Sequence, residues 1–260
     1  MFLVNLVVSA GAVVVLLGAV FAISVHRDRH DLIDVAWGLG FAVVAAVSWA
    51  LASQPNWVIA VLTIVWGGRL AVHIGLRNRG KPEDPRYVAI RKRAKGNPNL
   101  HLALKVYLLQ GVILLFVSLP VQVAQYTPAP PVWLVVVGVL VWLVGFGFET
   151  VGDWQLNRFK SDPANKGKLM TTGLWRYTRH PNYFGDAAVW CGLYLSACGS
   201  WAGAATVLSP VLMTWLLTNG SGKPLTEKHM RKSRPEYAAY ADRTSGFFPL
   251  PPKRAQRRAR

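Results

Sequence analysis

The sequence predicts an all-α fold, a polytopic membrane helix bundle with about seven transmembrane helices. Two observations support this prediction. The chain of 260 residues is 52% hydrophobic and only 16% charged, yet its formal net charge is +17. Apolar stretches of about 17–25 residues, the length that a helix needs to cross a hydrocarbon core, recur along it. We therefore expect the charged residues to be concentrated in the loops between the membrane spans.

Seven apolar stretches qualify as spans. The first has no positively charged segment before it and no small-residue cleavage site after it, so we interpret it as a retained span rather than a signal peptide. The last two are separated by only a few residues and are expected to form a tight hairpin. The seven stretches are residues 2–24, 33–52, 57–76, 103–125, 131–151, 184–200 and 203–218.

The distribution of charge predicts the orientation of the bundle. Of the 29 Lys and Arg, all except Arg69 lie in loops on one side of the seven-span arrangement, counting Lys105 at the start of the fourth span with the loop 77–105, or in the C-terminal tail. Loops rich in Lys and Arg remain in the cytoplasm. We therefore expect the N-terminus outside, the C-terminus in the cytoplasm and any active site open to the cytoplasm. The charge then reflects topology, and we expect no nucleic-acid partner.

These spans suggest three regions. Residues 1–220 form the transmembrane bundle, with cytoplasmic loops at 77–105 and 152–182. Residues 221–250 begin with a helical pattern and end in the apolar sequence FFPL, so we expect this cytoplasmic segment to fold back and close a pocket. Residues 251–260 form a basic flexible tail that contacts anionic lipid.

Several classes of site are excluded or disfavoured. Two cysteines are too few for a disulfide scaffold. We expect no metal site, because only six His are present, and we interpret His26 and His30 as part of a polar turn between the first two spans. Gly38-Leu39-Gly40 lacks the third glycine of a dinucleotide-binding fingerprint. A nucleotide would therefore bind between helices rather than on a Rossmann domain.

The segment GLWRYTRHPNYFGD, residues 173–186, carries the most chemistry. Pro181 suits the first turn of a helix because it lacks the N–H that would have no partner there. The positive end of such a helix favours an anion, and basic and aromatic residues surround it. A binding site for a dinucleotide and an interface loop facing lipid both remain open. The residues concerned are Trp175, Arg176, Tyr177, Arg179, His180, Tyr183 and Asp186.

Ionisable residues also lie within the early spans. Asp34 begins an otherwise apolar stretch, and Arg69 and His73 are four residues apart near the end of the third span. Ionisable groups at membrane depth usually face a partner or a water-filled cavity. An ion pair between Asp34 and Arg69 and a polar wall of a substrate cavity are both consistent with this pattern.

The RHPNYFGD block, followed by the tail pattern ExxxxxxxPEYxxYxxRTxxFxP, resembles the superfamily of steroid 5α-reductases, sterol reductases and isoprenylcysteine carboxyl methyltransferases. The stretches DVAWGLGF, GRLAVHIGLRNRGKPEDPRY and FETVGDWQLNRFK resemble its bacterial branch of uncharacterised steroid-reductase-like membrane proteins. The resemblance covers most of the chain from about residue 30 to 250. It implies a multi-pass protein of the bacterial inner membrane.

The resemblance implies that NADPH binds on the cytoplasmic side, in a pocket formed by the last spans. Tyr237 and Tyr240 in the tail are three residues apart, so they would share one helix face in the segment that closes this pocket. The candidates for cofactor binding, from the residue patterns and the resemblance together, are Asp153, Arg158, Lys160, Trp175, Arg179, His180, Asn182, Tyr183, Asp186, Glu227, His229, Arg231, Tyr237 and Tyr240.

The function that the resemblance implies is NADPH-dependent reduction of a C=C bond in a lipophilic substrate, of steroid, isoprenoid or enoyl-lipid type. Hydride addition to an enone develops negative charge on oxygen, so a polar group is needed to stabilise it. The candidates for this catalytic role are Asp34, Arg69, His73 and Tyr107.

Part of the superfamily pattern is absent from this chain. The Gln-Glu pair and the third-span Tyr that hold the ketone in steroid 5α-reductases have no counterpart in this sequence. The resemblance therefore concerns the cofactor half more than the substrate half. Two alternatives stay open, namely an S-adenosylmethionine-dependent lipid or isoprenylcysteine-type methyltransferase using the same pocket, and a non-catalytic lipid-binding protein. The many basic residues favour a cofactor that carries phosphates.

Overall fold

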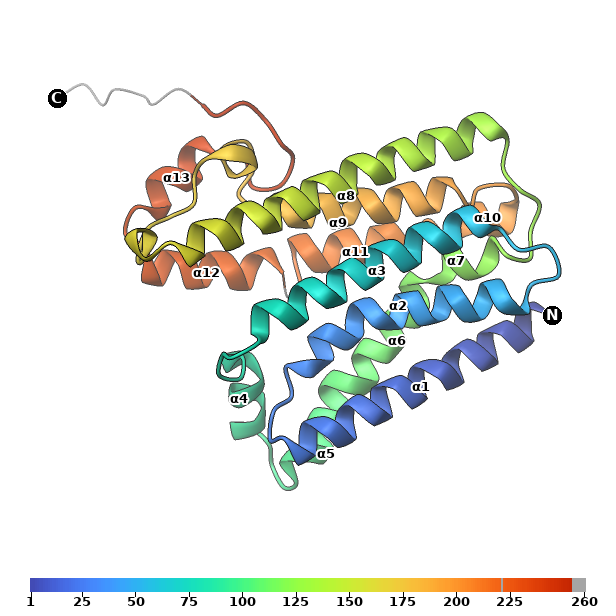
Figure 1. Ribbon diagram of the computed structural model, residues 1–260, viewed down its shortest axis with the longest axis horizontal. Helices are drawn as coiled ribbons and strands as arrows, with labels where there is room; N and C mark the ends of the chain where they lie inside the picture. The colour runs from blue at the N-terminus through green and yellow to red at the C-terminus, as the bar shows by residue number, and fades with distance from the viewer. Residues whose placement is uncertain (221, 254–260) are drawn as a thin grey trace. The chain divides into compact units, whose positions relative to one another are not determined.

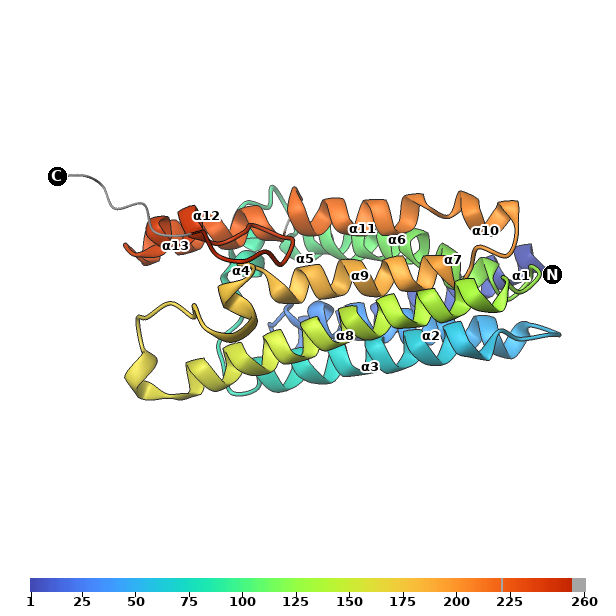
Figure 2. The ribbon, with the colours of Figure 1, turned by 90° about the horizontal axis from the view of Figure 1, so that it is seen from above.

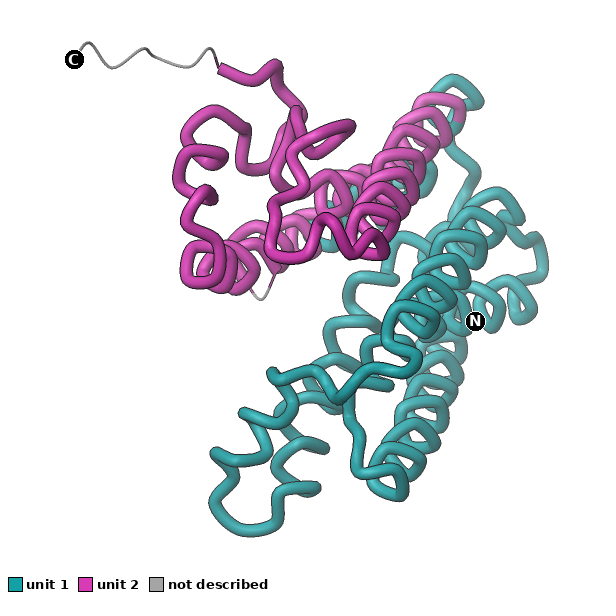
Figure 3. The backbone as a smooth tube through the Cα atoms, turned by 60° about the vertical axis from the view of Figure 1, so that its left-hand side comes forward, with its two compact units in different colours: residues 1–135, 193–209 teal, residues 136–192, 210–260 magenta. Residues whose placement is uncertain are grey.

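The computed structural model describes residues 1–220 and 222–253. This part of the chain is helical and contains one isolated β-bridge, between Thr178 and Ser245. The chain divides into two compact units, coloured teal and magenta in Figure 3. The first unit holds residues 1–135 and 193–209, and the second holds residues 136–192 and 210–260.

The first unit contains three long helices, α1 (Phe2–His26), α2 (Leu32–Leu51) and α3 (Trp57–Asn78). Helix α2 contacts both α1 and α3, and Figures 1 and 2 show α2 running alongside α3. The shorter elements of this unit are α4 (Pro85–Lys92), α5 (Pro98–Leu102), the π-helix η1 (Ala103–Leu108), α6 (Leu109–Val117), α7 (Leu119–Val123) and α10 (Trp201–Ala205).

The second unit is built on α8 (Val132–Ser161) and α9 (Pro181–Leu195), whose end residues Val132–Val135 and Leu193–Leu195 belong to the first unit. Two short 3₁₀ turns lie between these helices, η2 (Pro163–Asn165) and η3 (Gly173–Arg176). The C-terminal part adds α11 (Leu208–Thr218), whose first two residues belong to the first unit, α12 (Lys223–Ser233) and α13 (Tyr237–Arg243).

Helices α8 and α9 approach closely through glycines spaced seven residues apart on each helix, which we call the glycine interface (Gly138, Gly145, Gly185 and Gly192). A Cβ at Gly145 would lie 2.6 Å from the carbonyl oxygen of Gly185, and a Cβ at Gly192 would lie 2.5 Å from that of Gly138. Seven residues are about two helical turns, so these positions share one face. Small residues permit such close packing between membrane helices. This packing fixes the first turns of α9 against the middle of α8.

Six stretches among the described residues are long and apolar enough to cross a membrane, which agrees with a multi-pass protein. Helix α9 corresponds to another predicted span but has only 15 residues. The six stretches are Phe2–His26, Leu32–Leu51, Trp57–Asn78, Pro98–Val117, Val132–Ser161 and Trp201–Ser233.

The predicted span 103–125 differs from the observed helices. The helical stretch begins earlier, at Pro98, and the regular helix ends at Val117 before α7 begins. The physical reason is Pro120, whose ring would clash with the carbonyl group four residues earlier and which has no N–H to donate. That carbonyl belongs to Phe116, and its oxygen accepts a hydrogen bond from the hydroxyl of Ser209 instead (3.0 Å).

Helix α8 continues ten residues past the end of the span predicted at 131–151. The stretch DWQLNRFKS contains neither Gly nor Pro, so nothing in it terminates a helix before Asp162 and Pro163. The first part of the predicted loop 152–182 is therefore helical. Asp153, Arg158 and Lys160 consequently project from a helix.

Candidate functional site

The loop before α9 is held against α8 within the second unit. Gly173 has a φ of +61°, in the left-handed region that favours glycine, and a Cβ there would lie 2.5 Å from Nε2 of Gln155 and displace that amide. The N–H of Leu174 donates to Oε1 of Gln155 (2.9 Å), and Nε1 of Trp175 donates to the carbonyl oxygen of Gly152 (3.1 Å). The indole of Trp175 therefore anchors the loop to α8.

Helix α9 begins at Pro181, the position that the sequence predicted for a first-turn proline. Nδ2 of Asn182 donates to Oδ1 of Asp153 (3.3 Å), and both Asp153 and Glu149 are buried on α8. A carboxylate is favoured near the positive end of a helix. Asp153 therefore already occupies part of the environment in which an anionic ligand would be stabilised.

A buried charged cluster lies at the same end of the second unit. It consists of Arg179 and His180, from the loop, and Glu227, from α12. Nε and Nη2 of Arg179 donate to Oε1 of Glu227 at 3.0 and 2.9 Å, and Nε2 of His180 lies 3.2 Å from the same oxygen. Their side chains are only 11%, 4% and 13% exposed, in that order. A pair so shielded interacts more strongly than one on the surface.

His180 is also packed against an aromatic ring. Its imidazole is parallel to the ring of Tyr183, with centroids 5.1 Å apart. The hydroxyl of Tyr183 lies 3.3 Å from that of Thr226 on α12. Burial lowers the pKa of His180, and the Glu227 carboxylate opposes this effect. The cluster therefore holds a neutral imidazole beside a carboxylate near neutral pH.

The C-terminal segment (residues 237–250) folds back onto the loop before α9. The hydroxyl of Tyr240 donates to the carbonyl oxygen of Trp175 (2.5 Å), the hydroxyl of Thr178 donates to that of Phe247 (2.8 Å), and the N–H of Leu250 donates to that of Tyr177. Burial raises the pKa of Tyr240. Burial, together with the nearby Glu227 carboxylate, raises the pKa of Tyr237 to about 12, so both hydroxyls stay protonated. The segment is thus joined to the loop along its length.

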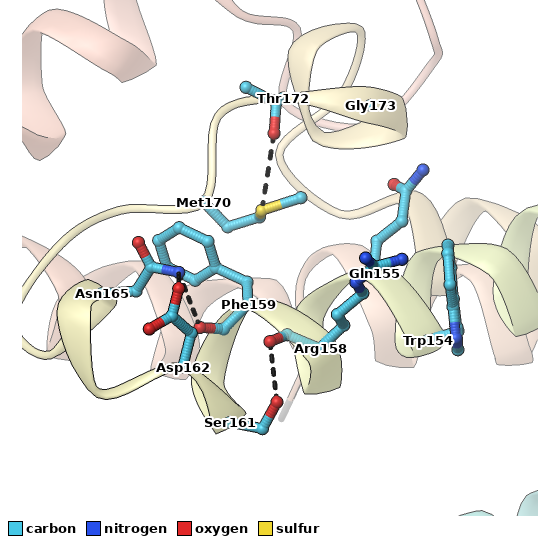
Figure 4. Close-up of a pocket in the computed structure, with 10 residues that line it drawn as sticks. All are labelled: Trp154, Gln155, Arg158, Phe159, Ser161, Asp162, Asn165, Met170, Thr172 and Gly173. Carbon is cyan, nitrogen blue, oxygen red and sulfur yellow. Dashed lines mark hydrogen bonds between the residues drawn. The ribbon is translucent and has the colours of Figure 1, made fainter.

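A cavity of about 540 Å³ opens at the end of α8, between that helix and the loop 162–173. Figure 4 shows the labelled side chains around it, with Arg158, Gln155 and Trp154 on the α8 side. The guanidinium carbon of Arg158 lies 5.5 Å from the centre of the Trp154 ring, within the range of a cation–π contact. The cavity is lined by Trp154, Gln155, Arg158, Phe159, Ser161, Asp162, Asn165, Met170, Thr172 and Gly173.

The carboxylate of Asp162 also faces this cavity, but it is engaged in local structure. It accepts hydrogen bonds from the N–H of Ala164 (2.9 Å) and from Nδ2 of Asn165 (3.4 Å), which stabilise η2. Arg158 has no ion-pair partner in residues 1–220 or 222–253 that would neutralise it. The cavity therefore combines a planar aromatic face, an amide and an available cation.

Other predicted cofactor residues lie outside these contacts. Lys160 is exposed on α8 and does not line the cavity, and His229 is exposed on α12. Arg231 places its guanidinium 5.8 Å from the ring centre of Tyr237. Asp186 is half-buried, one turn into α9. Their assignment to the cofactor remains a prediction.

The four catalytic candidates lie in the first unit. Asp34 accepts hydrogen bonds from the hydroxyl of Tyr87 (2.6 Å) and from Nη2 of Arg86 (2.9 Å), both on α4. Asp34 therefore forms an ion pair with Arg86, a partner that the sequence did not predict. The short helix α4 brings these two side chains back to the start of α2, which no local pattern around Asp34 encodes. Arg69 and His73 lie about one turn apart on α3.

Tyr107, the fourth candidate, lies in the π-helix η1 and is buried. Its hydroxyl is 3.2 Å from Nδ1 of His30, which has no exposed surface. The backbone N–H of His30 donates to Oε1 of Glu83 (2.7 Å). This hydrogen bond joins the turn between α1 and α2 to the loop after α3, which agrees with the interpretation of His30 as part of a polar turn.

Sequence reasoning did not single out several residues that the structure places at these sites. Tyr87 and Arg86 follow Asp84 and Pro85, an N-cap and a first-turn proline that together could have predicted α4. Trp154 and Gln155 follow Asp153 directly, and their role depends on the continuation of α8 beyond the membrane span. The hydropathy pattern did not predict this continuation, because it marks only the part of the helix that lies in the membrane.

Residues 20–244 match the model of a family described as protein of unknown function (DUF1295). The chain belongs to this family. The family is part of the steroid 5α-reductase-like superfamily, so the resemblance in the RHPNYFGD block and the tail reflects a family relationship.

Three curated relatives of this DUF1295 member differ in how much they share with it. An uncharacterized protein of Schizosaccharomyces pombe, C594.04c, is 25% identical over 249 residues, covering 84% of this chain and 70% of that protein. The 3-oxo-5-alpha-steroid 4-dehydrogenase 1 of Rattus norvegicus is 31% identical over 81 residues, 31% of this chain and 30% of that enzyme. The third is named probable O-methyltransferase ustE, of Ustilaginoidea virens, and is 39% identical over 62 residues, 24% of this chain and 22% of that protein. No solved structure gives a significant match to the chain.

Proposed function

We propose that this protein is a membrane-embedded reductase that uses NADPH to reduce a C=C bond in a lipophilic substrate of steroid, isoprenoid or enoyl-lipid type. The observation that carries the proposal is the combination, in one unit, of the loop before α9 and the cavity at the end of α8. Both belong to the part of the chain whose sequence resembles the cofactor half of the reductases. The limited identity to the rat 3-oxo-5-alpha-steroid 4-dehydrogenase 1 supports the same class of chemistry.

The residues present fit such a cofactor. Arg158 supplies a cation for phosphate, Trp154 supplies a flat face for a base, and Gln155 supplies an amide whose oxygen accepts a hydrogen bond from Leu174 and whose nitrogen is a hydrogen-bond donor. The carboxylate of Asp153 lies at the positive end of α9 and would repel a phosphate there. A cofactor phosphate would therefore lie near Arg158 rather than at the start of α9. NADPH, when bound, would supply the hydride for one carbon of the double bond.

The protein's own residues would bind and orient the reactants and exclude water. In this proposal the C-terminal segment covers the loop before α9, and Tyr183 and His180 present a stacked, uncharged aromatic surface beneath it. The candidates for stabilising negative charge or supplying the proton for the second carbon stay Asp34, Arg69, His73 and Tyr107. We also propose a seven-span bundle in a bacterial inner membrane, with α9 as the additional span and the site open to the cytoplasm.

A second candidate function is methyl transfer from S-adenosylmethionine to a lipid or an isoprenylcysteine-type thiol. It is favoured by the identity to the probable O-methyltransferase ustE over 62 residues. The two cofactors differ in charge, because NADPH carries phosphates and S-adenosylmethionine carries a sulfonium. Arg158 therefore favours the first, whereas the buried Glu149 and Asp153 would suit the second.

The decisive experiment is thermal unfolding of the detergent-purified protein with each cofactor. A ligand present at 100 times its dissociation constant stabilises the fold by about 2.7 kcal/mol. We expect NADPH to raise Tm and S-adenosylmethionine to leave it unchanged. ATP at the same concentration and ionic strength serves as a control for non-specific binding of anions to this basic chain. Stabilisation by S-adenosylmethionine without any by NADPH would reject the reductase.

A further inference from the structure

The guanidinium of Arg179 is almost fully engaged by contacts inside the second unit. Besides its two hydrogen bonds to Glu227, it donates through Nη1 to the carbonyl oxygens of Ala241 (2.9 Å) and Thr244 (2.6 Å). An arginine side chain has five N–H donors, and these four bonds use four of them. Little capacity remains for a ligand phosphate.

The two carbonyl groups lie at the C-terminal end of α13. The last carbonyls of a helix have no partner within the helix, and a cation near them interacts favourably with the helix dipole. The backbone N–H of Arg179 also donates to the carbonyl oxygen of Ser245 (2.9 Å). One residue therefore joins the loop before α9 to α12 and to the C-terminal segment.

The same contacts determine the position of His180. Oε1 of Glu227 accepts from Arg179 and faces Nε2 of His180 at 3.2 Å. Arg179 thus holds the carboxylate, and the carboxylate in turn holds the imidazole parallel to the ring of Tyr183. Loss of Arg179 would leave Glu227 without its cation and free the imidazole to rotate.

We propose that Arg179 is a positioning residue that fixes the C-terminal segment and, through Glu227, His180, and that it does not itself bind a cofactor phosphate. Its effect on the cofactor rests on the proposed function, whereas its effect on the segment rests on the contacts alone. The proposal reassigns a residue that the sequence placed among the direct cofactor contacts.

The first test measures hydrogen–deuterium exchange of residues 240–250 in detergent micelles without any cofactor. Arg179→Gln and Glu227→Gln are each expected to accelerate exchange about tenfold, and the double variant no further, because both act on one set of contacts. Arg179→Lys keeps the charge without the forked geometry and should give an intermediate rate. The matched control is Arg176→Gln, an exposed arginine of the same loop, which should match wild type. Unchanged exchange in Arg179→Gln and Glu227→Gln would overturn the proposal.

The second test measures the dissociation constant of NADPH for the same variants. A positioning role predicts that Arg179→Gln and Glu227→Gln both weaken binding, by about tenfold. Direct phosphate binding by Arg179 predicts the opposite sign for Glu227→Gln, because removing the competing carboxylate would free the guanidinium. Unchanged or tighter binding by Glu227→Gln would therefore refute the positioning role. Failure of wild type to bind NADPH would instead reject the proposed function, and the exchange experiment would still decide the role of Arg179 in the segment.

Discussion

The charged groups beside α4 in the first unit and those beside α12 in the second unit differ in how far water reaches them. In the first unit the side chains of Arg86 and Asp34 are 49% and 15% exposed, and those of Arg91 and Asp28 are 22% and 87% exposed, so each of these two pairs has one member largely in contact with water. In the second unit Arg179 and Glu227 are 11% and 13% exposed. Exposed ion pairs contribute about 0–1 kcal/mol, whereas removing one partner of a buried pair leaves an uncompensated charge. The number of ion pairs is therefore a poor guide to where each unit is vulnerable.

The largest expected effect is the removal of Arg179. Arg179→Met should lower the free energy of unfolding by about 3–5 kcal/mol, because Glu227 would stay buried without its cation. Arg176→Met, at an exposed position of the same loop, should change it by less than about 0.5 kcal/mol. Denaturant unfolding in micelles, followed by tryptophan fluorescence, compares the two. Equal stability of both variants would contradict the contrast between buried and exposed charge.

The next effect concerns the glycine interface of the second unit. A Cβ at Gly185 would lie 2.5 Å from the backbone nitrogen of Glu149, so Gly185→Ala should separate α8 from α9 and cost about 1–3 kcal/mol. Gly147→Ala, also on α8, meets no atom within 4 Å and should be neutral or stabilising by up to about 1 kcal/mol. Thermal unfolding of both variants measures the difference. A neutral Gly185→Ala would show that the two helices do not pack so closely.

Arg158 tests whether an exposed arginine without an ion-pair partner among the described residues has a function that Arg86 and Arg91 lack. Arg158→Gln should weaken NADPH binding by about 1.5–3 kcal/mol, the value of a hydrogen bond to a charged group. Lys160→Gln removes the same charge two residues away, outside the cavity, and should have a much smaller effect. Fluorescence titration with NADPH distinguishes them. Equal losses would point to a general effect of charge rather than to the cavity.

The two buried histidines provide a comparison by pH. Burial lowers the pKa of both His30, in the first unit, and His180, in the second. Because each folded-state pKa lies below the unfolded value of about 6.5, the unfolded chain binds more protons as the pH falls. The contribution of each histidine to stability is therefore complete above pH 6.5 and is lost below it, by up to about 1.4 kcal/mol per pH unit until its folded pKa is reached. His30→Asn and His180→Asn should each flatten the profile of Tm against pH, and a profile unaffected by either would contradict this account.

The smallest effect is expected at Asp28. Its side chain pairs with Arg91 but is mostly in water, and its backbone φ of +48° lies in the left-handed region that Asn also tolerates. Asp28→Asn should therefore change the free energy of unfolding by less than about 0.5 kcal/mol. Thermal unfolding checks this value. A loss of several kcal/mol would mean that the exposed cluster of the first unit is as critical as the buried cluster of the second.

Local patterns predicted much of the fold but less of the candidate site. Hydropathy indicated a multi-pass helical protein, and Pro181 marked the first residue of α9. Hydropathy alone ended the fifth span near residue 151, because it reports where a helix leaves the hydrocarbon and not where it stops. Helix α8 extends to Ser161 because no helix breaker precedes Asp162, and this extension forms one side of the cavity around Arg158. The length of the apolar span gave no information about this extension.

The sequence by itself determined the apolar spans, the gathering of positive charge in a few loops and the residue types available at the start of α9. It also indicated that Asp34, at membrane depth, faces a partner or a water-filled cavity, and it placed Arg179 and Glu227 among the candidates for cofactor binding. Only the tertiary structure decided which partners they have, since Asp34 and Arg86 are 52 residues apart and Arg179 and Glu227 are 48 apart. The physical reason is that burial makes an unpaired charge costly but does not specify the partner, which depends on which helix ends the packing brings within hydrogen-bond distance.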